Sequence, residues 1–412
     1  MVLYKSPANA RIKFSLWAIL FLSNNKTGGI HMPKRLLAAA LTLILFIPTA
    51  LAAPEADAPL ELSCKSAILM EKETGTVLYD RDSHKKLAPA SVTKIMTMLL
   101  VMEALDSGAI SPDDTVTVSA NAAGMGGSQV YLKQGEQMSV RELLKCVAVV
   151  SGNDCAVALA EYLAGSETAF VAKMNTRAVQ LGMSDTTFFN CTGLPAPGHE
   201  TTAHDIALMS RELILNHPDI RQYTTVWMDT IRDGTFGLTN TNRLIRFYEG
   251  ATGLKTGSTD AALYCMSATA QREGMELIAV VMASPTTAQR FSDAQTLLDY
   301  GFSSYALIDV HPEIPLPTVD VLLGKTPQIQ ALLSRPCRLL VEKQARGEVS
   351  TQLELCEDVQ APVEPGQTLG KLLVFVGDEL RDSVPITAAA GVERLSVPEI
   401  FKKLLRTMLA GC

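Results

Sequence analysis

The spacing of hydrophobic residues changes along the chain and divides it into three regions. At about residues 63–305, apolar residues at helical spacing alternate with strand-like runs, whereas at about residues 308–391 the runs are short, β-branched and separated by Pro and Gly. The Pro-rich stretch at residues 311–318 has the composition of a linker. The pattern predicts a large domain of mixed helices and strands, followed by a small all-β domain.

The third region, residues 394–412, has the pattern of a short amphipathic helix. Ser396 and Glu399 form an S-x-x-E capping box, and Leu395 and Ile400 are spaced as a hydrophobic staple. The apolar face repeats at i, i+3 and i+4 and consists of Val397, Ile400, Phe401, Leu404, Leu405, Met408 and Leu409. The other face carries Lys402, Lys403 and Arg406. At 1.5 Å per residue such a helix reaches about 21 Å, so it is expected to lie on a membrane surface without crossing it. The alternative is a helix that packs on the preceding domain.

The beginning of the chain has the pattern of a secretory signal. Residues 32–35, M-P-K-R, form a basic n-region, residues 36–47 are apolar and residues 50–52 form an A-x-A cleavage site, so the mature chain is expected to begin near Ala53. An uncleaved membrane anchor is the alternative, although the apolar run is short for a span. Residues 1–31 fit an upstream start codon that was chosen in error.

Composition and charge exclude some classes of protein. The chain has 412 residues, of which 47% are hydrophobic, so it can bury a sizeable core. Its formal net charge is -7, and the first 52 residues carry six basic residues and no acidic one, which leaves -13 on the remainder. An acidic excess of this size repels phosphate backbones, so no nucleic-acid partner is expected.

The cysteines do not predict a disulfide framework. Eight cysteines follow the signal, none of them in a C-x-x-C pair, and most are expected to be buried free thiols. Cys337 and Cys356 both lie in the smaller domain and form the one pair for which a disulfide is worth testing.

A buried helix is predicted to begin at Ser91, two residues after Pro89. Its apolar face consists of Ile95, Met98, Leu99, Met102 and Leu105. Lys94 therefore lies in the first turn of a helix that is apolar nearly all round, where the helix dipole and burial both lower its pKa. A neutral Lys three residues after a Ser can accept the hydroxyl proton and so create a nucleophile without a histidine. The ordinary alternative is a Ser N-cap followed by a solvated Lys.

Two further polar motifs follow in the chain. S-G-N-D at residues 151–154 ends an apolar run, and G-L-K-T-G-S-T at residues 253–259 opens a strand that is expected to continue through residues 264–270. After a turn near Gly274, this strand is expected to pair with residues 276–284. Each motif is weak alone. In this order, S-x-x-K, S-x-N and K-T-G match the motif triplet of penicillin-binding proteins and serine β-lactamases.

The resemblance is closest to the low-molecular-weight penicillin-binding proteins that are D-alanyl-D-alanine carboxypeptidases. It rests on P-A-S-V-T-K-I-M-T at residues 89–97, G-G-S-Q-V-Y-L at 126–132, S-G-N-D at 151–154, N-C-T-G-L-P at 190–195 and G-L-K-T-G-S-T-D at 253–260. It covers residues 63–305 and, more loosely, the β-rich domain and the amphipathic tail. The resemblance implies an α+β fold of the serine β-lactamase/transpeptidase type, with an antiparallel sheet, a helical subdomain and the active site between them.

The resemblance also implies catalytic roles. Ser91 would attack the carbonyl between two terminal D-alanines, with Lys94 as its base and Ser151 as the proton relay to the leaving amine. Asn153 would hold the substrate amide. The backbone N–H groups of Ser91 and Ser258 would form the oxyanion hole.

The K-T-G-S segment would bind the end of the substrate. Lys255 and Thr256 would hold the terminal carboxylate, since a fixed cation beside a hydroxyl suits a free chain end. Gly257 would let the strand and Ser258 approach the substrate closely. Lys255 would also help to keep Lys94 neutral by charge repulsion.

Two features of the sequence depart from or imitate related enzymes. The middle motif is S-G-N where class A β-lactamases have S-D-N, and this favours peptide hydrolysis over drug hydrolysis. Residues 212–216 spell E-x-x-L-N, the pattern around the deacylating Glu of class A enzymes. Residues from about Thr202 onward predict one amphipathic helix, so Glu212 is expected to be an ordinary helix residue.

Other chemistries lack their motifs. There is no G-x-S-x-G, no H-E-x-x-H and no G-x-x-x-x-G-K loop, so no Ser-His-Asp triad, no metal and no other cofactor are expected. The histidines after the signal are expected in surface or loop positions, and they are His84, His199, His204, His217 and His311.

Three hypotheses remain. The preferred one is a serine-type D-Ala-D-Ala carboxypeptidase that trims peptidoglycan stem peptides and is inhibited covalently by β-lactams. The others are a serine β-lactamase and a non-catalytic wall-binding protein on the same fold. The expected organisation is an extension and signal at 1–52, the peptidase domain at 53–306, the β-rich domain at 307–393 and the helix at 394–412. The mature protein is expected outside the cytoplasmic membrane, on its outer face or in the cell wall.

Overall fold

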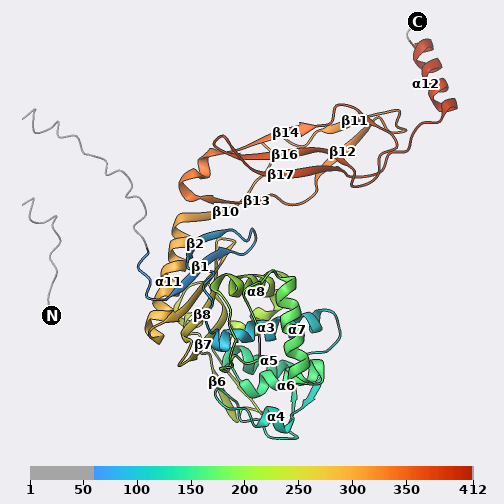
Figure 1. Ribbon diagram of the computed structural model, residues 1–412. Helices are drawn as coiled ribbons and strands as arrows, with labels where there is room; N and C mark the ends of the chain where they lie inside the picture. Colours follow the sequence, from blue (N-terminus) through green and yellow to red (C-terminus); the bar gives the residue numbers. More distant parts are fainter. Residues whose placement is uncertain (1–59, 411–412) are drawn as a thin grey trace, which may run out of the picture. The chain divides into compact units, whose positions relative to one another are not determined.

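The computed structural model describes residues 60–410, so the predicted signal sequence and Cys412 lie outside the described residues. A five-stranded antiparallel sheet forms the centre of the first domain (Figure 1), with the strand order β2, β1, β9, β8, β7. The strands are β1 (Ser66–Glu71), β2 (Val77–Arg81), β7 (Ala251–Thr259), β8 (Leu263–Arg272) and β9 (Met275–Ser284). Strand β7, which carries the K-T-G motif, is therefore an edge strand.

The path of the chain through this motif differs from the expectation of one continuous strand. Strand β7 ends at Thr259, whose Oγ1 accepts a hydrogen bond of 3.1 Å from the Ala262 N–H, and the chain then reverses into β8. The two strands pair antiparallel, with Lys255 opposite Ser267. No Gly or Pro marks this turn, so the apolar pattern continues through it without a break. The predicted pairing of the next two strands is confirmed by β8 and β9.

Helices cover both faces of the sheet. Successive side chains of each strand point to opposite faces, and both sets are apolar and buried. Ala67 and Leu69 of β1 belong to the core under α11 (Thr287–Ser304). Ile68 and Met70 belong to the core shared with the helical part. The helical part comprises α3 (Lys94–Asp106), α4 (Ala120–Ala123), α5 (Val140–Val149), α6 (Asn153–Ala164), α7 (Glu167–Gln180) and α8 (Ala203–Asn216). The predicted α+β class is confirmed.

Short elements complete the first domain. A 3-10 turn, η1 (Ala90–Thr93), precedes α3, and a second one, η2 (Pro218–Ile220), leads into α9 (Arg221–Thr224). The longer connections contain two small antiparallel strand pairs and one further helical turn. The pairs are β3 (Thr115–Thr117) with β4 (Gln137–Ser139) and β5 (Met228–Ile231) with β6 (Phe236–Thr239), and the helical turn is α10 (Leu244–Phe247).

The second domain is all-β, as predicted. A six-stranded sheet has the order β14, β16, β17, β12, β11, β15, and only β11 and β15 pair in parallel. Its strands are β11 (Thr318–Leu322), β12 (Gln328–Leu333), β14 (Val349–Leu355), β15 (Val359–Gln360), β16 (Thr368–Val376) and β17 (Glu379–Ala388). Strand β10 (Tyr305–Asp309) pairs with β13 (Arg338–Glu342), and η3 (Lys343–Glu348) follows. The expected boundary at 306/307 therefore lies within a paired strand.

The described residues end in helix α12 (Val397–Ala410), and the predicted helix is therefore present. The Glu399 carboxylate accepts hydrogen bonds from the backbone N–H and the hydroxyl of Ser396, at 2.7 and 2.6 Å, which satisfies a free donor at the helix start. Within residues 60–410, no single helix has the length and apolar composition of a bilayer span, and α6 with α7 reaches them only as a pair bent by 84°.

The cysteines of the described region are free thiols. Six of the seven are buried, and Cys356 is exposed. Cys337 directs its Sγ toward Asp382 Oδ2 at 3.7 Å, and no disulfide joins it to Cys356.

Candidate active site

Ser91 and Lys94 are joined at the junction of η1 and α3. The Lys94 Nζ donates hydrogen bonds to Ser91 Oγ at 3.0 Å, Asn153 Oδ1 at 2.6 Å and the Thr192 carbonyl at 2.7 Å. The helix is apolar and buried on nearly all sides, so the Lys94 side chain is fully enclosed. This burial lowers the pKa of Lys94 to about 7. A large share of the amine is therefore neutral near pH 7 and able to accept the Ser91 proton.

The S-G-N motif forms the turn between α5 and α6. Ser151 has a left-handed backbone, with φ of 64°, and its buried hydroxyl has no hydrogen-bond partner within residues 60–410. Asn153 begins α6, accepts from Lys94 and donates from Nδ2 to the Gly126 carbonyl at 2.7 Å. Asp154 Oδ2 accepts from the N–H groups of Val130 and Leu132, at 3.0 and 3.1 Å. The S-G-N-D turn therefore anchors the G-G-S-Q-V-Y-L segment.

Strand β7 lies directly against the backbone of Ser91. A Cβ on Gly257 would stand 2.8 Å from the Ser91 backbone nitrogen and 2.9 Å from that of Val92. Backbone atoms cannot yield as a side chain can, so only Gly allows this contact. Gly257 was expected to let the strand approach the substrate, and the structure shows a close approach of Gly257 to the backbone of Ser91.

Lys255 is also buried, and its Nζ donates to the Thr256 carbonyl at 3.0 Å. Burial, followed by the nearby charges of Lys94 and Arg290, lowers its pKa well below the usual value. For Lys94, burial is the leading cause of the lowered pKa, and the expected repulsion appears on Lys255. A carboxylate bound beside Lys255 would raise the pKa of this amine again and so favour its charged form, which would pair with the carboxylate.

Three residues that sequence reasoning missed hold the site together. The Thr192 carbonyl belongs to the N-C-T-G-L-P loop and accepts from Lys94. Thr241 accepts at 2.8 Å from Thr256 Oγ1, while its N–H donates to the Val149 carbonyl at 3.0 Å. Buried Arg290 of α11 donates to the Gly257 carbonyl at 3.2 Å. Only the family-like N-x-T-G-L-P pattern signalled one of them.

His199 was expected at the surface or in a loop. It lies in a loop, but its ring is buried, with Nε2 at 2.9 Å from Thr93 Oγ1 and Nδ1 at 3.3 Å from the Phe189 N–H, which donates to it. Burial lowers its pKa to about 4, so the ring is neutral. Its acceptor Nδ1 assigns the proton to Nε2, which donates to Thr93 beside Lys94.

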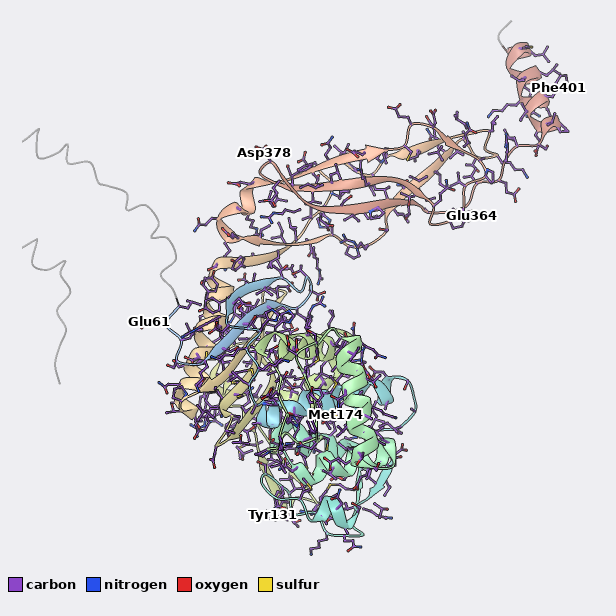
Figure 2. All side chains as sticks on the ribbon, in the orientation of Figure 1. Glu61, Tyr131, Met174, Glu364, Asp378 and Phe401 are labelled. Atoms are coloured by element: carbon purple, nitrogen blue, oxygen red, sulfur yellow. The ribbon has the colours of Figure 1, made fainter. Side chains whose placement is uncertain are left out.

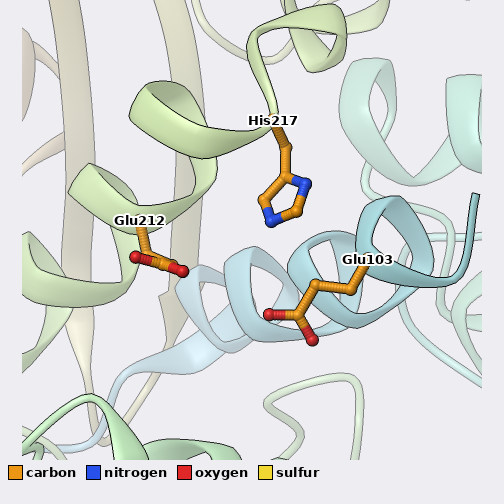
Figure 3. A group of neighbouring side chains, drawn as sticks. All are labelled: Glu103, Glu212 and His217. Carbon is orange, nitrogen blue, oxygen red and sulfur yellow. The ribbon is translucent and has the colours of Figure 1, made fainter. Parts of the chain in front are cut away.

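Glu212 takes part in a separate ion-pair network. Arg177 donates to Glu103 Oε1 at 2.6 Å and to Glu212 Oε1 at 2.5 Å. Figure 3 shows Glu103, Glu212 and His217 directed toward one another, and one ligand atom from each lies within 4.8 Å of the others. A divalent ion at these atoms would have to displace the Arg177 guanidinium. Glu212 thus lies within α8 as an ion-pair partner, in agreement with the interpretation of E-x-x-L-N.

Comparison with known proteins agrees with this geometry. The family model for D-alanyl-D-alanine carboxypeptidase matches residues 52–286, and the model for the penicillin-binding protein 5 C-terminal domain matches residues 313–394. The chain is 41% identical to D-alanyl-D-alanine carboxypeptidase DacF of Bacillus subtilis over 90% of this chain and 98% of that protein. It is 33% identical to DacC of Escherichia coli over 87% and 92%.

Comparison with solved structures also finds penicillin-binding proteins. Penicillin binding protein 5 from Haemophilus influenzae superposes with a TM-score of 0.72 at 28% identity, covering 82% of this chain and all of that one. Penicillin-binding protein D2 from Listeria monocytogenes, solved in its ampicillin-bound form, gives 0.55 at 35% identity over 60% of this chain and all of that one. The chain belongs to the D-alanyl-D-alanine carboxypeptidase family, peptidase S11.

Proposed function

We propose that the chain is a serine-type D-Ala-D-Ala carboxypeptidase that forms an acyl-enzyme on Ser91. The observation that carries the proposal is the buried Lys94 amine, hydrogen-bonded at 3.0 Å to Ser91 Oγ and with its pKa near 7. A hydroxyl becomes a nucleophile when an adjacent base is neutral at the working pH. In the residues that the structure describes, no imidazole is hydrogen-bonded to Ser91.

The acylation step follows from these contacts. Lys94 Nζ accepts the proton of Ser91 Oγ, the oxygen bonds to the carbonyl carbon of the penultimate D-alanine, and the N–H groups of Ser91 and Ser258 hold the oxyanion. The C–N bond then breaks. The leaving amine of the terminal D-alanine receives the proton from Lys94 through the unpartnered Ser151 hydroxyl.

Deacylation uses the same base. After D-alanine leaves, Lys94 is neutral again and accepts a proton from a water that attacks the ester. The Ser91–acyl bond breaks, Lys94 gives the proton from the water to Ser91 Oγ, and the shortened peptide is released. Asn153 holds the substrate amide beside the reacting carbonyl.

The carboxylate of the terminal D-alanine binds at Lys255, Thr256 and Thr241. Lys255 supplies the charge, and the two hydroxyls, 2.8 Å apart, supply donors once a carboxylate replaces their mutual contact. The substrate class is therefore a peptide with a free C-terminal carboxylate, as in peptidoglycan stem peptides. β-Lactams, which carry a carboxylate beside a strained amide, would acylate Ser91 covalently.

We further propose that the protein is exported and acts at the outer face of the cytoplasmic membrane. The support is the signal-like pattern of residues 32–52 and the exposed apolar face of α12, on which Phe401 is 67% exposed (Figure 2). A helix with an exposed apolar face flanked by cations binds in the plane of an anionic membrane surface.

The decisive experiment measures D-alanine release from diacetyl-L-Lys-D-Ala-D-Ala by the full chain, beside Ser91→Ala. Release that disappears in the variant supports the carboxypeptidase and its nucleophile. Rapid penicillin hydrolysis without D-alanine release would instead support a serine β-lactamase. Absence of both reactions, and of covalent labelling by fluorescent penicillin, would support a non-catalytic wall-binding protein.

A further inference from the structure

A cavity of about 320 Å³ lies beside the nucleophile and has no role in the mechanism above. It is lined by residues 88–90, which lead into Ser91, by residues 193–197 of the N-C-T-G-L-P loop, and by Thr259 and Ala261 at the end of β7. The lining is Ala, Pro, Gly and Leu apart from Thr259 and His199.

The direction of strand β7 relates this cavity to the substrate. The terminal carboxylate binds at the side chains of Lys255 and Thr256, and the scissile carbonyl, which is one substrate residue before it, binds further along the strand, between Ser91 and the N–H group of Ser258. An extended peptide rises about 3.3 Å per residue, as the strand does. The part of the substrate that precedes the two D-alanines therefore lies beyond Ser258, beside Thr259 and Ala261, which line the cavity.

Leu194 connects the cavity with the catalytic cleft. It lines the cavity, and its Cδ2 lies 3.7 Å from the position that a Gly127 Cβ would take. That same position is 2.8 Å from Asn153 Nδ2. The cavity is thus next to the amide that is proposed to hold the acyl part of the substrate.

The chemistry of the lining selects the kind of group that fits. No lining residue carries a charge, because His199, the one titratable residue of the lining, is buried and neutral. An apolar wall favours methylene groups, and a buried ionised end would lose its hydration without gaining a partner.

We propose that this cavity binds the side chain of the residue that precedes the two terminal D-alanines, and that it prefers an uncharged aliphatic chain. The inference rests on the proposed function, which fixes the orientation of the substrate. A diamino acid whose distal amine is acylated or cross-linked is then a better substrate than one whose amine is free.

Three peptides test the inference with the full chain. They are diacetyl-L-Lys-D-Ala-D-Ala, its analogue with a free ε-amine, and acetyl-L-Ala-D-Ala-D-Ala, which lacks the long side chain. We expect kcat/KM for D-alanine release to be about tenfold higher for the diacetyl-lysyl peptide than for the alanyl peptide, with the free amine between them. Equal values for all three would overturn the inference.

Substitutions that fill the cavity provide a second test of the inference. Ala196→Leu reduces the cavity from the loop, and Ala261→Leu reduces it from the end of β7. Either variant is expected to bring the ratio of kcat/KM between the diacetyl-lysyl and alanyl peptides from about ten to about one. Ala109→Leu, an exposed position after α3, is the matched control and should keep the ratio. A ratio that persists in both filled variants, with fluorescent penicillin still bound, contradicts the cavity assignment.

The outcomes also separate this inference from the proposed function. If no peptide releases D-alanine, the proposed function fails. If all peptides release it without a preference for the third residue, only the cavity assignment fails.

Discussion

Gly193 lies so close to Ala90 that a Cβ at this position would stand 1.8 Å from the Ala90 carbonyl oxygen and 2.9 Å from Thr93 Oγ1. Gly193 also has φ of 83°, which favours glycine. The loop whose Thr192 carbonyl accepts a hydrogen bond from Lys94 therefore packs tightly against η1, the turn that contains Ser91. The positions of Lys94 and Ser91 therefore depend on the same contact.

Gly193→Ala is therefore expected to displace η1 and to lower the rate of acylation by fluorescent penicillin about 100-fold, as displacements of about 1 Å do in other sites. Gly182→Ala is the matched control, because Gly182 also has a left-handed backbone, with φ of 76°, but has no atom within 4 Å of the added Cβ. The control should lose only the about 1–2 kcal/mol of a left-handed Ala and acylate at the normal rate. Equal acylation by both variants would show that the Ala90 contact does not matter.

The acylation rate should depend on pH through Lys94. Burial lowers its pKa to about 7, so the amine is protonated and unable to act as a base below that pH, and it is neutral above it. The second-order rate of acylation by penicillin is expected to rise about tenfold from pH 6 to pH 8, with a midpoint near 7. Stopped-flow fluorescence measures this rate.

Lys94→Arg is the control for the pH profile, because guanidinium stays charged over this range. It should acylate slowly at every pH and lose the midpoint near 7. A wild-type rate that stays flat between pH 6 and pH 8 would contradict the role of Lys94 as the base.

Thr241 should affect substrate binding more than the chemical step. Thr241→Val removes the hydroxyl that accepts from Thr256 and faces the proposed carboxylate site. The KM for the diacetyl-lysyl peptide is expected to rise about tenfold or more, the equivalent of one hydrogen bond to a charged group, with little change in kcat. Thr241→Ser should restore the KM. A fall in kcat at constant KM would instead place Thr241 in the catalytic step.

Glu212→Gln separates the two interpretations of the E-x-x-L-N pattern. Glu212 shares Arg177 with Glu103, and both acidic side chains are only partly exposed, at 20% and 28%. Loss of this pair should cost about 1 kcal/mol in the free energy of unfolding, measured by urea titration, because solvent still screens the charges. The lifetime of the penicilloyl enzyme should stay within about twofold, since a charge in a separate network does not add to the barrier of deacylation. A much longer lifetime would make Glu212 a deacylating residue.

Residues close in the sequence were the most predictable part of the site. Ser91 and Lys94 are three residues apart on one helical turn, so helical geometry alone brings their side chains together, and the apolar helix around them predicts the burial of Lys94. The turn at residues 260–262 was not predictable from pattern, because Asp, Ala and Ala carry no turn signal as strong as Gly or Pro.

Contacts between distant segments could not be derived in this way. The Thr192 carbonyl meets Lys94 across 98 residues, and Thr241 meets Thr256 only because the loop before β7 folds back over the strand. His199 is buried with Thr93 as a partner for its ring, a contact that no local pattern indicates. The order of the motifs in the sequence was enough to reveal the resemblance to a family. The supporting contacts could be seen only in the folded structure.

The apolar face of α12 provides the last prediction. Phe401 and Leu404 are 67% and 55% exposed, and burying two such side chains in lipid contributes about 3 kcal/mol or more. Phe401→Asp with Leu404→Asp is expected to lower binding of the protein to phosphatidylglycerol-containing vesicles at least about tenfold in co-sedimentation, because the two charges would have to enter the lipid boundary. D-alanine release from the soluble peptide should be unchanged. Val179→Asp is the matched control, since this valine is 78% exposed on α7 and belongs to no proposed membrane face. Vesicle binding that survives the double substitution, or that Val179→Asp also removes, would contradict surface anchoring through α12.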